Sequence, residues 1–148
     1  MRDEGVIGVG YEGQSIEDFV AGLVRWRVAT VVDVRLNAIS RKRGFSKRAL
    51  TAALLDGGIR YLHLPQLGNP RENRAAYSSA ETSEGLLARE MFDLLLESDP
   101  ARAALTDVAR LAANERVAVM CFEASELHCH RREVLSALRA RTDDLIAV

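Results

Sequence analysis

The chain has 148 residues, with 20 Lys and Arg against 21 Asp and Glu, a formal net charge of −1, and 48% hydrophobic residues. This length and apolar content suit one domain with its own core and exclude a disordered chain, which combines low hydrophobicity with high net charge. Because the chain is nearly neutral, binding of phosphate or nucleic acid would need a local basic patch. No apolar run approaches the ~20 residues of a membrane span, and the charged N-terminus lacks the apolar core of a secretion signal. We therefore expect a cytoplasmic protein that does not contact a membrane.

Short runs rich in Val and Ile alternate along the chain with longer segments of helical periodicity. Strands are predicted at residues 6–10, 29–34, 59–64 and 117–121, with a shorter one at 145–148. Helices are predicted from Ser15 through Trp26, from a Ser46 cap to Gly57, along the apolar positions Leu86, Leu87, Met91, Leu94 and Leu95, from Pro100 through Leu111, and from about His128 through Leu138. Continuous apolar strands separated by helices are typical of a parallel sheet covered on both faces. The prediction is an α/β fold. Residues 1–148 are predicted to form a single three-layer domain with a mainly parallel, Rossmann-like sheet of about four to five strands flanked by helices.

Two stretches, residues 35–45 and 67–83, fit no element, and the second is long for a loop in a compact domain. Ligands of open parallel sheets bind beyond the carboxyl ends of the strands, so the residues that follow each strand are the first candidates for a site. Three of these strand ends carry polar residues.

The first polar strand end is Asp33-Val34-Arg35, followed by the basic run Arg41-Lys42-Arg43 before a helix N-terminus. An ionised Asp33 near the end of a buried strand is costly unless it is paired. Two interpretations are open. Asp33 and Arg35 form a structural pair beside a solvated basic loop, or Asp33, Arg35 and Arg43 bind an anionic substrate with help from the helix N-terminus.

The second polar strand end runs from Cys121 to Arg131 and concentrates reactive side chains just before the last helix. Either cysteine could be a nucleophile with a histidine as base, and Glu123 with a histidine could move protons. The candidate catalytic residues are Glu123, His128, Cys129 and His130, and Arg131 is a candidate for binding an anion. Cys121 as ordinary core packing is a competing interpretation, because buried cysteine behaves as a small hydrophobe.

A metal site made from Cys121, His128, Cys129 and His130 is disfavoured on geometric grounds. Structural zinc sites usually separate the ligands of a pair by two to four residues, and three consecutive side chains cannot all point at one ion without an unusual backbone. We expect neither a metal nor a cofactor.

The third polar strand end runs from His63 to Arg71, where Gly68 and two prolines predict a rigid turn. His63 is a candidate substrate-binding residue, with Asn69, Arg71 and Arg74 as further contacts. A lone histidine at such a position is more often half-buried and satisfied by the fold.

Together these stretches resemble the DUF488 family, a set of small prokaryotic proteins of unknown function. The resemblance is carried by Gly8-Val9-Gly10-Tyr11, Val31-Val32-Asp33-Val34-Arg35, Arg43-Gly44-Phe45-Ser46, Ile59 to Gly68, Met120-Cys121-Phe122-Glu123 and His128-Cys129-His130-Arg131. Tyr11 and Glu12 stand where the family's usual opening has His and Ser, so the resemblance carries over no role for that histidine. The resemblance to this family implies no activity.

A looser likeness is to rhodanese-type sulfurtransferases, in which one buried strand ends in Asp-Val-Arg and a later strand ends in Cys. Cysteine-based phosphatases place an Arg six positions after the Cys. Here that position is Leu127 and Arg131 lies ten positions on, so the phosphatase spacing fails. A likeness of fold outline alone does not fix function.

Three functions follow as hypotheses. The first is an anion- or phosphate-binding α/β domain, which could be an enzyme acting on a nucleotide or nucleic acid at the carboxyl ends of the strands. The second is a non-catalytic nucleic-acid-binding module that uses the Arg41-Lys42-Arg43 patch, and its binding would depend strongly on salt. The third is a thiol-based sulfurtransferase or redox protein that uses Cys121 or Cys129. The expected partner is an anionic small molecule or nucleic acid, and a homodimer is left open.

Overall fold

The computed structural model describes residues 4–70, 73–74, 82–123, 129–139 and 141. In chain order its elements are β1 (Gly5–Gly10), α1 (Ile16–Arg25), β2 (Thr30–Asp33), α2 (Lys47–Asp56), β3 (Arg60–His63), the 3₁₀ helix η1 (Pro65–Leu67), α4 (Ser83–Leu96), α5 (Asp99–Ala112), β4 (Arg116–Cys121) and α6 (Arg131–Arg139). The predicted strands and helices that fall in these ranges are all present, with ends displaced by a few residues. The strand predicted at 145–148 lies outside the described residues.

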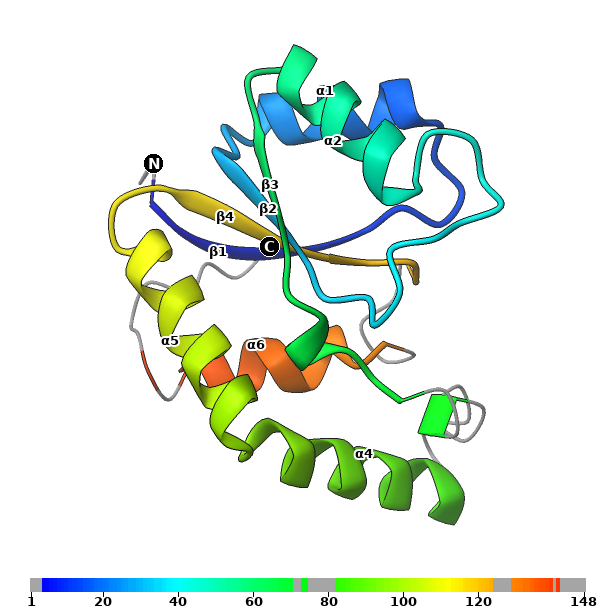
Figure 1. Ribbon diagram of the computed structural model, residues 1–148, viewed down its shortest axis with the longest axis vertical. Coiled ribbons are helices and arrows are strands. Elements are labelled where there is room, and N and C mark those ends of the chain that lie inside the picture. Colours follow the sequence, from blue (N-terminus) through cyan, green and yellow to red (C-terminus); the bar gives the residue numbers. More distant parts are fainter. Residues whose placement is uncertain (1–3, 71–72, 75–81, 124–128, 140, 142–148) are drawn as a thin grey trace.

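The strands form one parallel sheet in the order β1-β4-β2-β3 (Figure 1). In its register Gly10 is opposite Cys121, and Asp33 is opposite both Met120 and His63. This confirms the predicted α/β fold with a parallel sheet. Because all four strands run the same way, their carboxyl ends lie at one edge and bring Tyr11, Asp33 and Cys121 into the same region.

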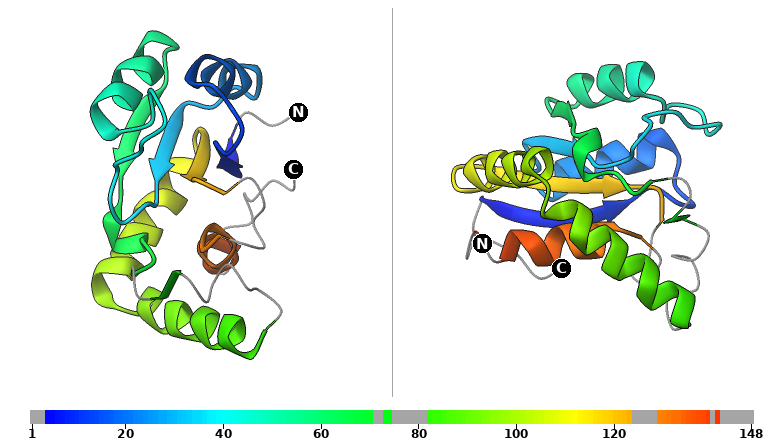
Figure 2. Two further views of the ribbon diagram at one scale, coloured as in Figure 1. Left: turned by 90° about the vertical axis from the view of Figure 1, so that its right-hand side faces the viewer. Right: turned by 60° about the horizontal axis from the view of Figure 1, so that its bottom comes forward.

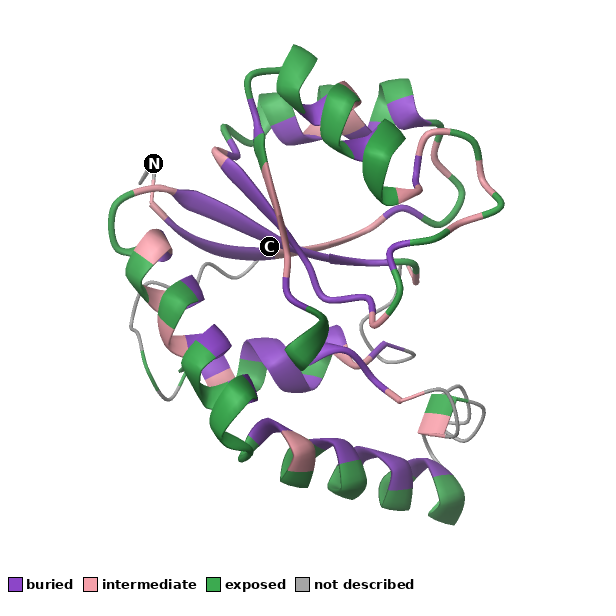
Figure 3. Cartoon of the chain, viewed as in Figure 1, coloured by how far each residue is buried: buried purple, intermediate pink, exposed green. Residues whose placement is uncertain are grey.

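Helices cover both faces of the sheet, with α1 and α2 on one side and α5 and α6 on the other (Figure 2). Neighbouring strand residues point to opposite faces. Ile7 and Val31 join the core beneath α1 and α2, while Val6 and Val32 join the core beneath α5 and α6. The central strands β2 and β4 are buried along their whole length (Figure 3), as their continuous apolar sequences predict.

Helix α4 turns most of its leucines outward, which its sequence did not indicate. Leu87, Met91 and Leu94 are each at least 60% exposed. The buried side of the helix carries Ala88 and Phe92, among others. It packs against α5 and α6 beyond the sheet, so only a narrow stripe needs to be apolar. None of the described helices is both long enough and apolar enough to cross a membrane.

The two predicted serine caps behave differently. The Ser15 hydroxyl accepts a hydrogen bond from the Asp18 N–H at 3.1 Å and so caps α1. Ser46 stands at the N-cap of α2 without capping it. Its hydroxyl accepts from the Ser40 N–H at 2.9 Å and donates to the Ser40 carbonyl at 3.1 Å. Ser46 therefore closes the loop between β2 and α2.

Candidate functional site

A cavity of about 270 Å³ opens at the carboxyl ends of the strands. Its lining comes from the end of β1, the loop after β2, the segment after η1, the end of β4 and the turn before α6. The lining residues are Tyr11, Arg35, Leu36, Asn37, Ile39, Asn69, Arg74, Cys121, Phe122, Glu123, Cys129 and His130. The cavity thus gathers residues from all three polar strand ends that the sequence singled out.

Asp33 forms a buried ion pair with Arg35 behind this cavity. The Asp33 side chain is fully buried, and its carboxylate accepts from the backbone N–H and from Nε and Nη2 of Arg35 at 2.7–3.1 Å. The Tyr61 hydroxyl also donates to it at 2.6 Å. Burial and this hydrogen bond to a carboxylate raise the pKa of Tyr61. A buried, ionised Asp33 needs a partner of opposite charge, and Arg35 is that partner.

The guanidinium of Arg35 is largely committed within the fold. Besides Asp33, its Nη1 donates to the Tyr11 hydroxyl at 3.1 Å and to the Phe45 carbonyl at 2.7 Å. Although burial opposes the charged form, the hydrogen bonds with Asp33 raise the pKa of Arg35. Arg35 lies in the cavity wall, but its contacts are those of a structural pair rather than of a free anion clamp.

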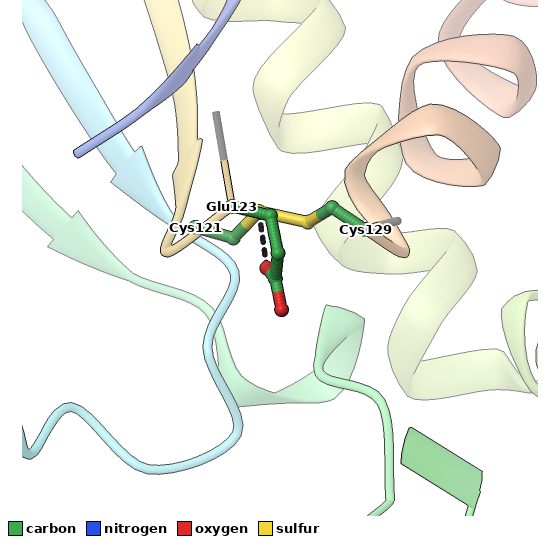
Figure 4. Close-up of side chains that lie close together, drawn as sticks. All are labelled: Cys121, Glu123 and Cys129. Carbon is green, nitrogen blue, oxygen red and sulfur yellow. Dashed lines mark hydrogen bonds between the residues drawn. A yellow bond between two sulfur atoms is a disulfide. The ribbon is translucent and has the colours of Figure 1, made fainter. Parts of the chain in front are cut away.

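Cys121 and Cys129 are joined by a disulfide bond at the wall of the cavity. Cys121 ends β4 and Cys129 lies in the turn before α6 (Figure 4). Both residues are only 1% exposed, although both line the cavity. In the sequence, either cysteine is a candidate nucleophile and Cys121 is also a candidate for core packing, whereas the structure joins the two in one disulfide.

Arg131 donates hydrogen bonds to both sulfur atoms of this disulfide. Its side chain is buried, and its Nη1 donates to the Cys121 sulfur at 3.4 Å and to the Val9 and Glu123 carbonyls. Its backbone N–H donates to the Cys129 sulfur at 3.3 Å. A guanidinium and a helix N-terminus both stabilise thiolates. Arg131 therefore acts on the sulfur atoms and is not itself one of the cavity-lining residues.

Glu123 and His130 are the titratable neighbours of the disulfide. A Glu123 oxygen lies 3.6 Å from the Cys121 sulfur, and burial raises the pKa of this carboxyl. His130 Nε2 lies 2.7 Å from the Val34 carbonyl, which can only accept, so Nε2 carries the proton and donates. Burial lowers the pKa of His130 to about 4. The neutral ring then turns the lone pair of Nδ1 toward the Cys129 sulfur, 3.8 Å away.

The other predicted site residues lie apart from this group. Arg43 forms an exposed ion pair with Glu17, and the Nε2 of His63 lies 2.7 Å from the Arg35 carbonyl. Neither lines the cavity. His128 lies outside the described residues. The structure thus brings together Glu123, Cys129 and His130 of the predicted catalytic set, with Arg35 in the wall and Asp33 and Arg131 behind it.

The segment after η1 approaches the loop after β2 closely at Gly68. A Cβ at this position would lie 2.5 Å from the Leu36 Cα and 2.7 Å from the Leu36 nitrogen, so only glycine fits against that backbone. Asn69, which follows Gly68, lines the cavity, as does Asn37, which follows Leu36. Arg74 Nε donates to the Asn69 carbonyl at 3.1 Å, which holds the arginine over the same cavity.

Several residues of the site gave only a weak signal in the sequence. Tyr61 follows the alternation of an ordinary strand, and Asn37 stands in a loop without a motif. Arg74 and Asn69 were noted only as further contacts. The Cys121–Cys129 pairing had one available signal, namely that both cysteines flank the same turn.

Comparison with protein families decides the assignment. The model of a domain of unknown function, DUF488, matches residues 15–138. The chain belongs to the DUF488 family. This confirms the resemblance seen in the sequence. No curated protein and no solved structure matches this DUF488 chain.

Proposed function

We propose that this DUF488 protein is a thiol–disulfide redox protein whose reactive unit is the Cys121–Cys129 pair. The observation that carries the proposal is the disulfide in the wall of a cavity, surrounded by an arginine, a half-buried carboxyl and a neutral histidine. Reactive cysteines lie in electropositive, partly accessible surroundings. Of the three functions that the sequence left open, thiol chemistry uses the largest number of these contacts.

The chemistry requires a thiol as reductant. A thiolate of the reductant attacks the Cys129 sulfur, the bond between the two cysteines breaks, and Cys121 leaves as a thiolate. Arg131 Nη1, 3.4 Å from Cys121, stabilises that leaving group. A second thiolate then attacks the sulfur of the mixed disulfide, which releases Cys129 and forms the disulfide of the reductant. Two electrons pass from two thiolates to the cysteine pair.

The neighbouring groups handle the protons of this exchange. Glu123, whose pKa is raised by burial, lies within reach of Cys121 and can protonate its thiolate. Nδ1 of the neutral His130 can accept the proton of a Cys129 thiol when the pair is oxidised again. In this scheme each sulfur has its own proton carrier.

The test is a redox titration of the folded protein. Samples are equilibrated in buffers of graded thiol-to-disulfide ratio and then alkylated, and the masses are recorded. We expect both cysteines to change together in one reversible transition, and Glu123→Gln to slow reduction by at least about tenfold. Independent alkylation of the two cysteines, or a disulfide that resists every reducing buffer in the folded protein, would overturn the proposal.

Glu12→Gln is the matched control for the proton step. Glu12 is an exposed carboxylate whose charge acts on Glu123, but it does not line the cavity. The rate of reduction should therefore stay close to that of the wild type. Equal rates in the Glu123→Gln and Glu12→Gln variants would remove Glu123 from the proton transfer while leaving the cysteine pair in place.

Anion binding in the same cavity is a second candidate function, and Arg74 favours it. This side chain is exposed and lines the cavity beside the amides of Asn37 and Asn69. Arg74 is therefore a better candidate than Arg35 for contacting an anion, because the donors of Arg35 are engaged with Asp33, Tyr11 and Phe45. The nucleic-acid alternative draws less support, since Arg43 of its basic patch pairs with Glu17 and the Lys42 ammonium approaches the Tyr11 carbonyl.

Titration with inorganic phosphate and with a nucleoside monophosphate, followed by calorimetry, tests this second function. We expect binding that weakens with salt and that Arg74→Ala weakens about tenfold, the order expected for one charged hydrogen bond. Arg43→Ala should leave binding unchanged, because Arg43 lies outside the cavity. Equal losses of affinity in the Arg74→Ala and Arg43→Ala variants would show that the anion binds outside this cavity.

A further inference from the structure

Three metal-ligating groups converge at the disulfide. One sulfur each of Cys121 and Cys129 and a carboxylate oxygen of Glu123 all lie within 4.8 Å of one another. Figure 4 shows the Glu123 carboxylate next to the bonded sulfur atoms. The ligands come from two chain segments, the end of β4 and the turn before α6. Two thiolates and a carboxylate are ligands of the types that zinc takes in proteins.

This set differs from the one that the sequence disfavoured. The disfavoured set contained three consecutive side chains, His128, Cys129 and His130, which cannot all face one ion. Here Cys129 is the only member of that run, and Glu123 stands two residues after Cys121. The three ligands therefore need no unusual backbone.

The spacing of the two cysteines also suits a shared ion. Their Cα atoms are 7.3 Å apart, whereas most disulfides have Cα atoms about 4.4–6.8 Å apart. Two sulfurs bound to one tetrahedral zinc at about 2.3 Å each lie roughly 3.8 Å from one another. Once the pair is reduced, the same backbone can hold the sulfurs at the separation that an ion requires.

The surroundings balance the charge of such a centre. Zn²⁺ with two thiolates and a carboxylate has a net charge of −1, and the Arg131 guanidinium lies 3.4 Å from the Cys121 sulfur. The Arg131 backbone N–H donates to the Cys129 sulfur. Donors to ligand sulfurs orient the ligands and tune the metal. With three protein ligands, the fourth position faces the cavity and is open to water or to a substrate.

We infer that the reduced protein binds one Zn²⁺ through Cys121, Glu123 and Cys129, and that oxidation of the cysteine pair releases it. With a peroxide as oxidant, the two thiolates give up two electrons and form the disulfide. The peroxide O–O bond breaks to give two hydroxide ions, and Zn²⁺ leaves because two of its ligands are gone. This inference rests on the proposed function only in requiring that the cysteine pair can be reduced.

Cobalt(II) is the probe, since tetrahedral thiolate ligation gives it an intense visible spectrum and a sulfur-to-metal charge-transfer band. The full chain is reduced without oxygen, freed of reductant and titrated with Co²⁺, and Zn²⁺ is then added in competition. We expect one equivalent of Co²⁺ with the thiolate band, displacement by Zn²⁺, and no band from the disulfide form. Peroxide added to the loaded protein should abolish the band and release the metal to a chromophoric chelator.

Variants separate ligation from folding. Cys121→Ser and Cys129→Ser should each weaken binding more than about 100-fold, and Glu123→Gln at least about tenfold, because loss of a direct ligand costs at least as much as loss of a group that supports one. Glu12→Gln is the matched carboxylate control and should bind like the wild type. Circular dichroism of each reduced variant verifies that it is folded.

The outcomes for the metal and for the redox function are distinguishable. Reduced, folded wild type without a thiolate band overturns the metal site even if the disulfide titrates reversibly. A metal bound equally well by the Cys129→Ser variant overturns it too. Metal binding in a protein whose cysteines never form the disulfide would support the ligation, but it would overturn both the oxidative release of the metal and the proposed redox function.

Discussion

Replacing Asp33 with Ala is expected to lower the free energy of unfolding by about 3–5 kcal/mol, the cost of leaving one member of a buried ion pair without its partner. The Arg35 side chain is only 8% exposed and would keep its charge in the core. The Tyr61 hydroxyl would lose its acceptor at the same time. Urea unfolding followed by circular dichroism measures the loss, and Asp33→Asn, which keeps the size and one acceptor oxygen, should lose less.

Two further variants decide whether the loss comes from the buried charge. Glu17→Ala breaks the exposed pair with Arg43 and should cost less than about 1 kcal/mol. The double variant Asp33→Ala with Arg35→Met removes both charges and should recover much of the stability, because replacing a whole buried pair with apolar groups is often neutral. A single Asp33→Ala variant as stable as Glu17→Ala would contradict this account.

The sequence predicted the fold well because the two central strands, β2 and β4, are buried on both faces. Runs such as Val31-Val32 and Val117-Ala118-Val119 are apolar without interruption, and only a sheet covered by helices on both sides needs that pattern. The location of the site followed from the same topology, since parallel strands bring their carboxyl ends to one edge. The sequence did not predict which face of α4 is buried, because leucines at 87 and 94 are equally compatible with a buried or an exposed stripe.

The chemistry of the site was harder to predict than its location. Charge at Arg35 and Arg131 suggested anion binding, but their partners include the carbonyls of Phe45, Val9 and Glu123, and backbone acceptors leave no mark in a sequence. The pairing of Cys121 with Cys129 depends on how the fold brings the end of β4 next to the start of α6. Composition and spacing reveal neither the backbone acceptors nor the cysteine pairing. The disulfide between Cys121 and Cys129 is therefore seen only in the structure.

In the disulfide form, His130 is expected to contribute a loss of about 2–3 kcal/mol of stability between pH 6.5 and pH 4, because the fold holds its ring in the neutral form. Its folded pKa is about 4, lowered from 6.5 chiefly by burial. Between these values the unfolded chain binds a proton that the folded chain does not, so stability falls as the pH falls through this window. Of the neighbouring charges, Arg74 and Arg131 reinforce the lowering, while Asp33 and the hydrogen bond to Val34 oppose it.

Urea unfolding of the oxidised, metal-free protein at several pH values measures this dependence without thiols or metal that could titrate with it. His130→Gln keeps a donor for the Val34 carbonyl but cannot be protonated in this range, so most of the slope between pH 6.5 and 4 should disappear. His63→Gln alters a half-buried histidine at the end of β3 and should retain the slope. A slope that survives in His130→Gln would show that His130 is not buried in its neutral form, and would remove it as the base for Cys129.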